Sequence, residues 1–153
     1  MERIEIMKSE YSDYFENIKA SNTIFLYSKE FSKELWSNYF DENSKSYFSL
    51  DDENWLIKSN EFELGEWIDY FNDDNSELVK KHLQKSIDWE LDDEVLFFIS
   101  SLLSIQTTWE IFLNSWVSFL ECDDDCPILI NKSNKQKEAI IFKPIGSFSF
   151  FKN

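Results

Sequence analysis

The clearest hydrophobic pattern in the chain lies in its second half, over residues 109–120. The apolar positions there recur every three or four residues, which is the spacing of a helix that faces a core. Thr107 and Glu110 stand at the start of this run with the T-x-x-E spacing of a capping box. We therefore predict a helix that begins after Thr107 and buries Trp109, Phe112, Leu113, Trp116, Phe119 and Leu120.

Weaker helical patterns occur elsewhere in the chain. Residues 76–87 place apolar side chains on one side of a helix and lysines on the other, so they predict an amphipathic helix. Ser28 can cap a helix that runs to about residue 40, because serine is favoured at that position and apolar residues follow at helical spacing. The same spacing over residues 11–18 predicts a shorter helix.

Short apolar runs rich in aromatic and β-branched residues predict strands. The stretch 41–75 has no dominant period, and there we expect a strand near residues 54–58 and a helix near residues 66–71. Short turns separate the strands in the second half, which favours antiparallel pairing. The other predicted strands are residues 23–27, 94–100, 127–130, 138–143 and 148–151.

Together these elements predict a single domain over residues 1–153. No linker rich in Gly, Ser or Pro divides the chain, and its length suits one hydrophobic core. The mixture of helices and antiparallel strands predicts the α+β class. We expect an antiparallel sheet of about four or five strands with the helices packed mainly on one face.

Charge adds a functional expectation to this fold. The chain contains 15 Lys and Arg against 30 Asp and Glu, so its formal net charge is −15. Aromatic residues make up 18% of the chain, which supplies a core and argues against disorder. Such a charge keeps a protein soluble and monomeric. It also repels nucleic acids and anionic membranes, and it favours cations or a basic protein as partner.

The sequence offers little for catalysis. His82 is the sole histidine and lies on or beside the apolar face of its predicted helix, so we expect a structural role for it. No G-x-S-x-G turn presents a serine, and two glycines in the whole chain do not make a phosphate-binding loop. We expect no catalytic residues, no cofactor and no metal site, and therefore a protein that is not an enzyme.

Cys122 and Cys126 flank three aspartates and allow three interpretations. Zinc needs three or four protein ligands, and the chain has no other cysteine. A disulfide would close the turn between them, whereas two free thiols suit a reducing compartment. Because the first ten residues are charged where a signal peptide is apolar, we expect a cytoplasmic protein with free thiols.

Acidic residues gather in four clusters between the predicted elements. None of them has the alternating carboxylates, central glycine and closing glutamate of an EF-hand calcium loop. Solvated loop charge explains any one cluster, but four clusters on a chain of this charge favour an acidic surface that faces a partner. Trp55 and Trp67 are aromatic candidates for the same surface. The candidate partner-binding residues are Asp123, Asp124, Asp125, Asp92, Asp93, Asp51, Asp52, Asp73 and Asp74.

The order of elements in residues 94–153 resembles that of a known group of proteins. It contains the strand DDEVLFFIS, the helix TTWEIFLNSWVSFLE, the acidic break DDDCPILI and the hairpin EAIIFKPIGSFSF. This order resembles the immunity proteins of bacterial polymorphic toxin systems, in particular those of contact-dependent growth inhibition. In those proteins an Asp-rich turn follows such a helix, and here that turn is Asp124-Asp125-Cys126-Pro127.

The resemblance implies a cytoplasmic protein that binds one cognate toxin domain and blocks its active site or substrate groove. Many such toxins are nucleases with basic grooves, which agrees with the basic partner expected from the charge. Two alternatives stay open. One is an acidic mimic of nucleic acid that inhibits nucleases in general, and the other is a divalent-metal-dependent enzyme that uses paired carboxylates.

Overall fold

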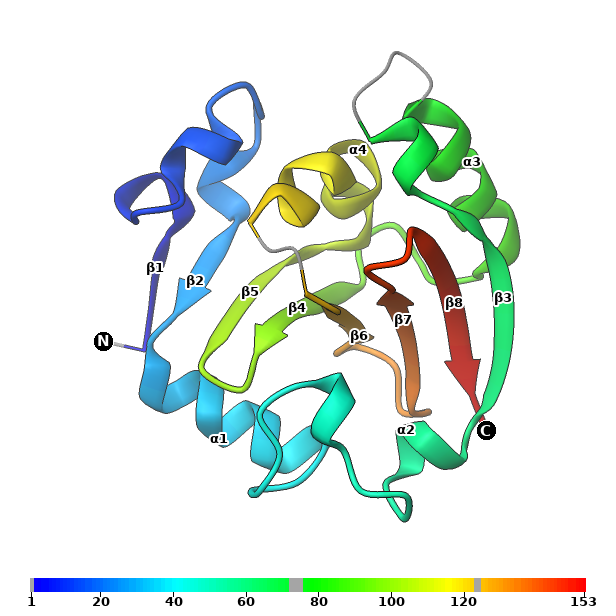
Figure 1. Ribbon diagram of the computed structural model, residues 1–153. Coiled ribbons are helices and arrows are strands. Elements are labelled where there is room, and N and C mark those ends of the chain that lie inside the picture. Colours follow the sequence, from blue (N-terminus) through cyan, green and yellow to red (C-terminus); the bar gives the residue numbers. More distant parts are fainter. Residues whose placement is uncertain (1, 72–75, 123–124) are drawn as a thin grey trace.

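The computed structural model describes residues 2–71, 76–122 and 125–153. Within these ranges the chain forms one sheet of eight strands in the order β1-β2-β5-β4-β6-β7-β8-β3, and all neighbouring strands are antiparallel (Figure 1). β1 and β3 are the two edges of this sheet. The strands are β1 Arg3–Glu5, β2 Phe25–Tyr27, β3 Asn60–Glu66, β4 Glu94–Ser100, β5 Leu103–Thr108, β6 Ile128–Asn131, β7 Glu138–Phe142 and β8 Ser147–Lys152.

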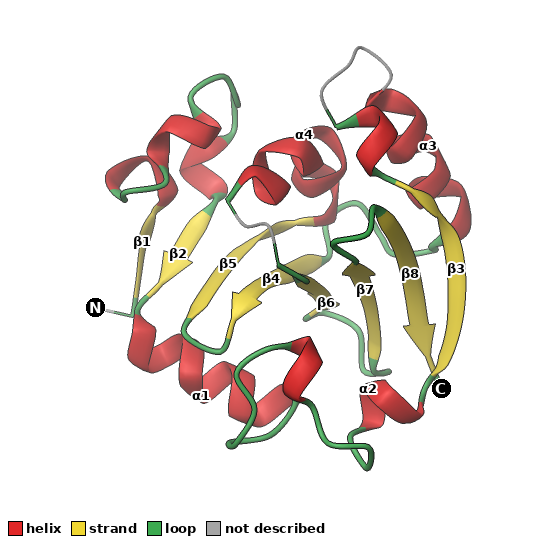
Figure 2. Ribbon diagram, viewed as in Figure 1, coloured by secondary structure: helices red, strands yellow, loops and turns green. Residues whose placement is uncertain are grey.

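Helices, short 3-10 turns and loops connect these strands (Figure 2). The predicted cap of the first long helix is confirmed, because the Ser28 side chain accepts a hydrogen bond from the backbone N–H of Phe31 at 3.2 Å. The predicted amphipathic helix is confirmed as α3. The helices are α1 Lys29–Tyr39, α2 Trp55–Lys58, α3 Ser76–Ser86 and α4 Trp109–Glu121, and the 3-10 turns are η1 Ile6–Lys8, η2 Ser12–Phe15, η3 Ser21–Thr23, η4 Tyr47–Ser49 and η5 Ile68–Tyr70.

Helices cover both faces of the sheet (Figure 1). Successive residues of a strand point to opposite faces. In β4, Val95 and Phe97 belong to an apolar cluster with α3 and α4, whereas Leu96 and Phe98 belong to a second cluster with α1 and α2. Because β4 is apolar on both faces, each face needs a cover that excludes water.

The predicted fold class is wrong in two respects, although the mixture of helices and antiparallel strands is correct. The sheet has eight strands within the described ranges instead of four or five, and helices lie on both of its faces. The strands missed by the prediction are β1, β3 and β5. β1 has three residues and β3 is mostly exposed, so neither leaves an apolar run, and polar residues interrupt the apolar positions of β5.

α4 confirms the predicted core helix, since its six predicted apolar residues are all buried. Its N-cap, however, is Thr108, whose hydroxyl accepts a hydrogen bond from the backbone N–H of Ile111 at 3.4 Å. The predicted cap, Thr107, instead lies inside β5 opposite Val95. Strand pairing extends to Thr108, and this moves the start of the helix along the chain by one residue.

Three other predicted elements differ in the structure. Residues 54–58 contain the helix α2 and not a strand, because the Asn54 side chain accepts a hydrogen bond from the Leu56 N–H at 3.0 Å and caps a helical turn. Near residues 66–71 the chain leaves β3 and makes only the 3-10 turn η5. Residues 11–18 contain η2 and no α-helix.

Candidate partner-binding site

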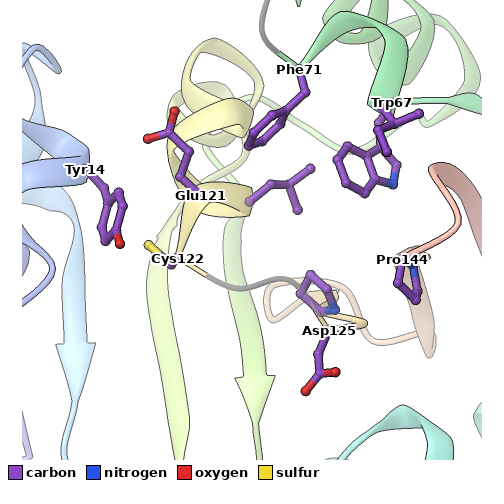
Figure 3. A pocket seen from close by; sticks show the side chains of 10 residues that line it. Tyr14, Trp67, Phe71, Glu121, Cys122, Asp125 and Pro144 are labelled. Carbon is purple, nitrogen blue, oxygen red and sulfur yellow. The ribbon is translucent and has the colours of Figure 1, made fainter.

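A pocket of about 680 Å³ opens beside the C-terminal end of α4 (Figure 3). Its walls come from η2, from η5 and the residues that flank it, from the last turn of α4 and the residues after it, and from the turn between β7 and β8. These segments are far apart in the sequence, so only the folded chain brings them together. The lining residues are Tyr14, Trp67, Ile68, Phe71, Leu120, Glu121, Cys122, Asp125, Pro127 and Pro144.

The wall formed by η5 is fixed to the β7–β8 turn. The backbone N–H of Trp67 donates to the Gly146 carbonyl at 2.7 Å, and the indole N–H of Trp67 donates to the Lys143 carbonyl at 3.0 Å. Gly146 has a φ of +106° and lies against Ile68, and a Cβ atom placed at Gly146 would be 2.8 Å from the Ile68 Cβ. A glycine is therefore required there for both conformation and space.

An ion pair links the same turn to the edge strand β3. Lys143 Nζ lies 2.6 Å from Glu61 Oε2, and the Ser149 hydroxyl donates to the same oxygen at 2.8 Å. Burial on its own would raise the pKa of Glu61, but the hydrogen bonds from Lys143 and Ser149 outweigh burial and lower that pKa below its usual value. The turn that supports the pocket is thus held partly by a charged contact.

The opposite wall is the last turn of α4. Phe119 and Leu120 are buried in the core and fix this turn, while the next residue, Glu121, is exposed. Cys122 is the C-cap of the helix, and its thiol donates a hydrogen bond to the Ser118 carbonyl at 3.5 Å. Glu121 is therefore an exposed carboxylate on a rigid support.

The pocket combines aromatic walls with a negatively charged rim. The rings of Trp67 and Phe71 are 5.6 Å apart at an interplanar angle of 70°, and Figure 3 shows them together on one side of the cavity with Tyr14 on the other. The charged residues that line the pocket are Glu121 and Asp125, and no Lys, Arg or His lines it among the described residues. This arrangement suits an apolar group that lies next to a positive charge.

The predicted aspartates do not form one site. Asp125 lines the pocket, whereas Asp123, Asp124, Asp73 and Asp74 lie outside the described residues. β4 and β6 are antiparallel neighbours, so the start of β4 lies beside the end of β6. Asp92 and Asp93 come directly before β4, whereas Asp125 comes before the start of β6. These two loops are therefore at opposite ends of the same strand pair.

The loop with Asp51 and Asp52 lies elsewhere again. Leu50 and Leu56, on either side of this loop, pack in the cluster under α1, on the sheet face away from α4. The Asp51 carboxylate accepts a hydrogen bond from the Glu53 N–H at 2.9 Å, and Asp52 is exposed. Asp51 therefore has a local structural contact.

Nearly all described carboxylates point toward solvent. Glu138 is the one described Asp or Glu that is buried, and it accepts hydrogen bonds from the Trp89 indole at 3.0 Å and the Asn134 side chain at 3.1 Å. Ion pairs occupy few of the others. Among the described residues these pairs are Lys8–Glu5, Lys58–Glu53, Lys80–Glu77, Lys132–Glu94 and Lys143–Glu61.

The remaining candidate groups are dispersed. His82 is exposed on α3, with its ring 5.9 Å from that of Phe148, and it lines a separate pocket of about 330 Å³ with Glu66 and Asp69. Cys122 and Cys126 are not joined by a disulfide. Within the described ranges no three His, Cys, Asp or Glu side chains are grouped closely enough to hold a metal ion, and no helix is long and apolar enough to cross a membrane.

Sequence reasoning identified part of this pocket and missed the rest. Asp125 is a candidate because it belongs to an acidic cluster, and Trp67 because it is an aromatic residue near the acidic middle of the chain, and both line the cavity. Glu121 could have been found as the exposed position that ends a core helix. Tyr14, Phe71 and Pro144 gave no signal, because their contribution depends on contacts between distant segments.

Comparison with known proteins places the chain in a family. Residues 12–150 match the family model described as "Protein of unknown function (DUF2947)". No curated protein and no solved structure matches the chain. The matched range covers most of the chain and includes every residue that lines the pocket, from Tyr14 to Pro144. The chain therefore belongs to the DUF2947 family.

Proposed function

We propose that this protein is an immunity protein that binds and neutralises a basic toxin domain in the cytoplasm and catalyses no reaction. The observation that supports this proposal is an apolar pocket whose charged lining residues are Glu121 and Asp125. The pocket lies on a chain of net charge −15 whose described carboxylates are almost all exposed. Such a surface is complementary in charge to a cationic protein surface.

Electrostatics gives this surface a kinetic advantage. Complementary charge can raise association rates to about 10⁸–10⁹ M⁻¹s⁻¹ and disfavours partners of the wrong sign. Rapid capture matters when the free partner is destructive. A nuclease is a suitable partner, because its substrate groove must itself be basic to bind a polyanion.

The proposal is tested by co-expression. If a neighbouring gene encodes a large secreted protein with a variable C-terminal domain, that domain is the partner to try. We expect cells that express the domain to survive when this protein is present, and the two proteins to co-purify. Glu34→Gln, a change to an exposed residue of α1, is the control and leaves rescue intact. Death of the cells despite soluble co-expression would overturn the proposal.

Inhibition by general mimicry of nucleic acid is distinguished by salt and by partner range. A mimic held by charge alone loses binding steeply as salt rises, and it binds unrelated basic nucleases. An immunity protein with an apolar contact keeps substantial affinity for its cognate domain at high salt, and it does not bind an unrelated basic nuclease. Isothermal titration at low and high NaCl separates the two cases.

A further inference from the structure

The structure also points to how the partner is held. We infer that the pocket beside the end of α4 receives an apolar side chain of the partner, and that Lys or Arg residues next to that side chain contact Glu121 and Asp125. This inference rests on the proposed function, because it takes the partner to be a basic protein.

The mouth of the pocket exposes apolar surface that folding has not covered. Ile68 is 48% exposed and Tyr14 is 41% exposed, although both line a cavity together with the buried Leu120. Apolar surface next to a concave site is typical of an interaction surface. An inserted apolar side chain would remove these groups from water.

Charge determines what must lie next to that side chain. An ammonium or guanidinium group inside an apolar cavity, without a paired carboxylate, would be strongly disfavoured. Glu121 and Asp125 are exposed at the rim, so a cation gains most beside the cavity and not within it.

The pocket is formed before any partner arrives. The Trp67 indole is held by its hydrogen bond to Lys143, and its ring packs edge-on against Phe71. Phe71 in turn contacts the ring of Trp116 in α4, with centroids 6.4 Å apart. A rigid cavity loses little conformational entropy on binding, which is the property that makes an anchor site effective.

The test is a titration followed by NMR, with three short peptides as probes. The first has a central leucine between lysines, the second replaces the leucine with serine, and the third replaces the lysines with glutamate. We expect the first peptide to shift the indole N–H signal of Trp67 and leave that of Trp55 unchanged. Trp55 is a matched reporter, because it is also partly buried but packs in the cluster under α1.

We expect the serine peptide to bind about tenfold more weakly than the leucine peptide, since a buried leucine contributes to binding and serine does not. Ile68→Ser and Glu121→Gln each weaken binding of the leucine peptide. The matched controls are Leu102→Ser, at a residue 47% exposed in the β4–β5 turn, and Glu34→Gln. Neither control alters binding, because neither residue lines the pocket.

The two proposals fail in different ways. If the leucine and serine peptides bound equally well, and Ile68→Ser bound the leucine peptide as well as the unmodified protein does, the inference of an apolar anchor would be overturned. The attraction to a basic partner would remain. Equal binding of the lysine and glutamate peptides would overturn the proposed function itself. A Trp67 signal that stays fixed while the leucine peptide binds would place the contact elsewhere and overturn the inference.

Discussion

Asp92 and Asp93 are neighbours in the loop before β4, but their carboxylates have different surroundings. The Asp93 carboxylate accepts a hydrogen bond from the Glu90 N–H at 3.0 Å and another from the Asn131 side chain at 2.8 Å. Its backbone carbonyl accepts the Trp109 N–H at the start of α4. Asp92 is exposed. Asp93 is thus part of the framework that joins β4, β6 and α4.

We expect Asp93→Ala to lower the free energy of unfolding by about 1–3 kcal/mol, because hydrogen bonds to a charged group are lost. Asp92→Ala, the matched control, should change it by less than about 0.5 kcal/mol, as is usual for an exposed position. Urea denaturation of both variants measures the difference. Equal effects would mean that the hydrogen bonds of Asp93 contribute nothing to stability.

Gly146 supports the pocket through its conformation and its lack of a side chain. We expect Gly146→Ala to destabilise the protein by about 1–3 kcal/mol, because alanine is strained at a φ of +106° and its Cβ meets Ile68. The double variant Gly146→Ala/Ile68→Ala should regain part of that loss, since it removes the contact with the Ile68 Cγ2 atom but keeps the contact with Cβ and the backbone strain. Thermal unfolding of the single and double variants tests this, and strictly additive losses would contradict it.

The start of α4 shows how one element sets the limits of the next. β5 continues through Thr108, and only there does the chain turn into the helix. The Thr108 hydroxyl caps α4, whereas the buried Thr107 hydroxyl has no hydrogen-bond partner among the described residues. The two adjacent threonines therefore contribute to stability in opposite ways.

We expect Thr108→Ala to lower the free energy of unfolding by about 1 kcal/mol through loss of the cap. Thr107→Val keeps the shape of the side chain and removes an unsatisfied hydroxyl, so it should be neutral or stabilising. Chemical denaturation compares them directly. If Thr107→Val lowered the free energy of unfolding more than Thr108→Ala, Thr108 would not be the residue that caps α4.

The link between β3 and the β7–β8 turn depends on pH. The pKa of Glu61 is lower in the folded protein than its ordinary value of 4.5, so its contribution is present above that value and is lost as the pH falls through the folded-state pKa. We expect stability to fall on acidification below about pH 4.5, and to fall less steeply in Lys143→Met. Lys33→Met, at an exposed residue of α1, should follow the unmodified protein. Parallel curves for all three proteins would contradict the role of the ion pair.

Elements with strong apolar patterns could be predicted from the sequence, and elements defined by distant contacts could not. α4, α3 and the strands β4, β7 and β8 bury continuous or periodic apolar positions, which is a local signal. β3 has the sequence NEFELGE and is a strand only because β8 pairs with it. The candidate site shows the same division, since an acidic cluster marks Asp125 but nothing local marks Tyr14 or Phe71.

At the scale of the whole molecule, the excess of negative charge opposes compactness. With a net charge of −15 and few ion pairs in the described parts of the chain, repulsion between carboxylates destabilises the folded state. Salt screens this repulsion, because the Debye length falls from about 30 Å at 0.01 M to about 8 Å at 0.15 M. The same excess of negative charge would attract the basic partner proposed above.

We therefore expect added NaCl to raise the melting temperature of the isolated protein. A variant in which the exposed Glu16, Glu34 and Glu42 are changed to Gln should show a smaller rise, because it has less repulsion to screen. Differential scanning calorimetry at low and moderate NaCl compares the two. A melting temperature that falls with NaCl would mean that attractive ion pairs dominate.

The position of β3 at the edge of the sheet affects when the fold can be completed. Among the described strands β3 pairs only with β8, and Asn60 lies opposite Lys152, which is far from it along the chain. A ribosome must therefore release the last strand before the middle of the chain can complete the sheet, and such long-range pairing is slow. The same holds for the pocket, whose walls at Trp67 and Pro144 meet only then. A nascent chain in which β8 is still inside the ribosome therefore lacks both the completed sheet edge and the completed pocket.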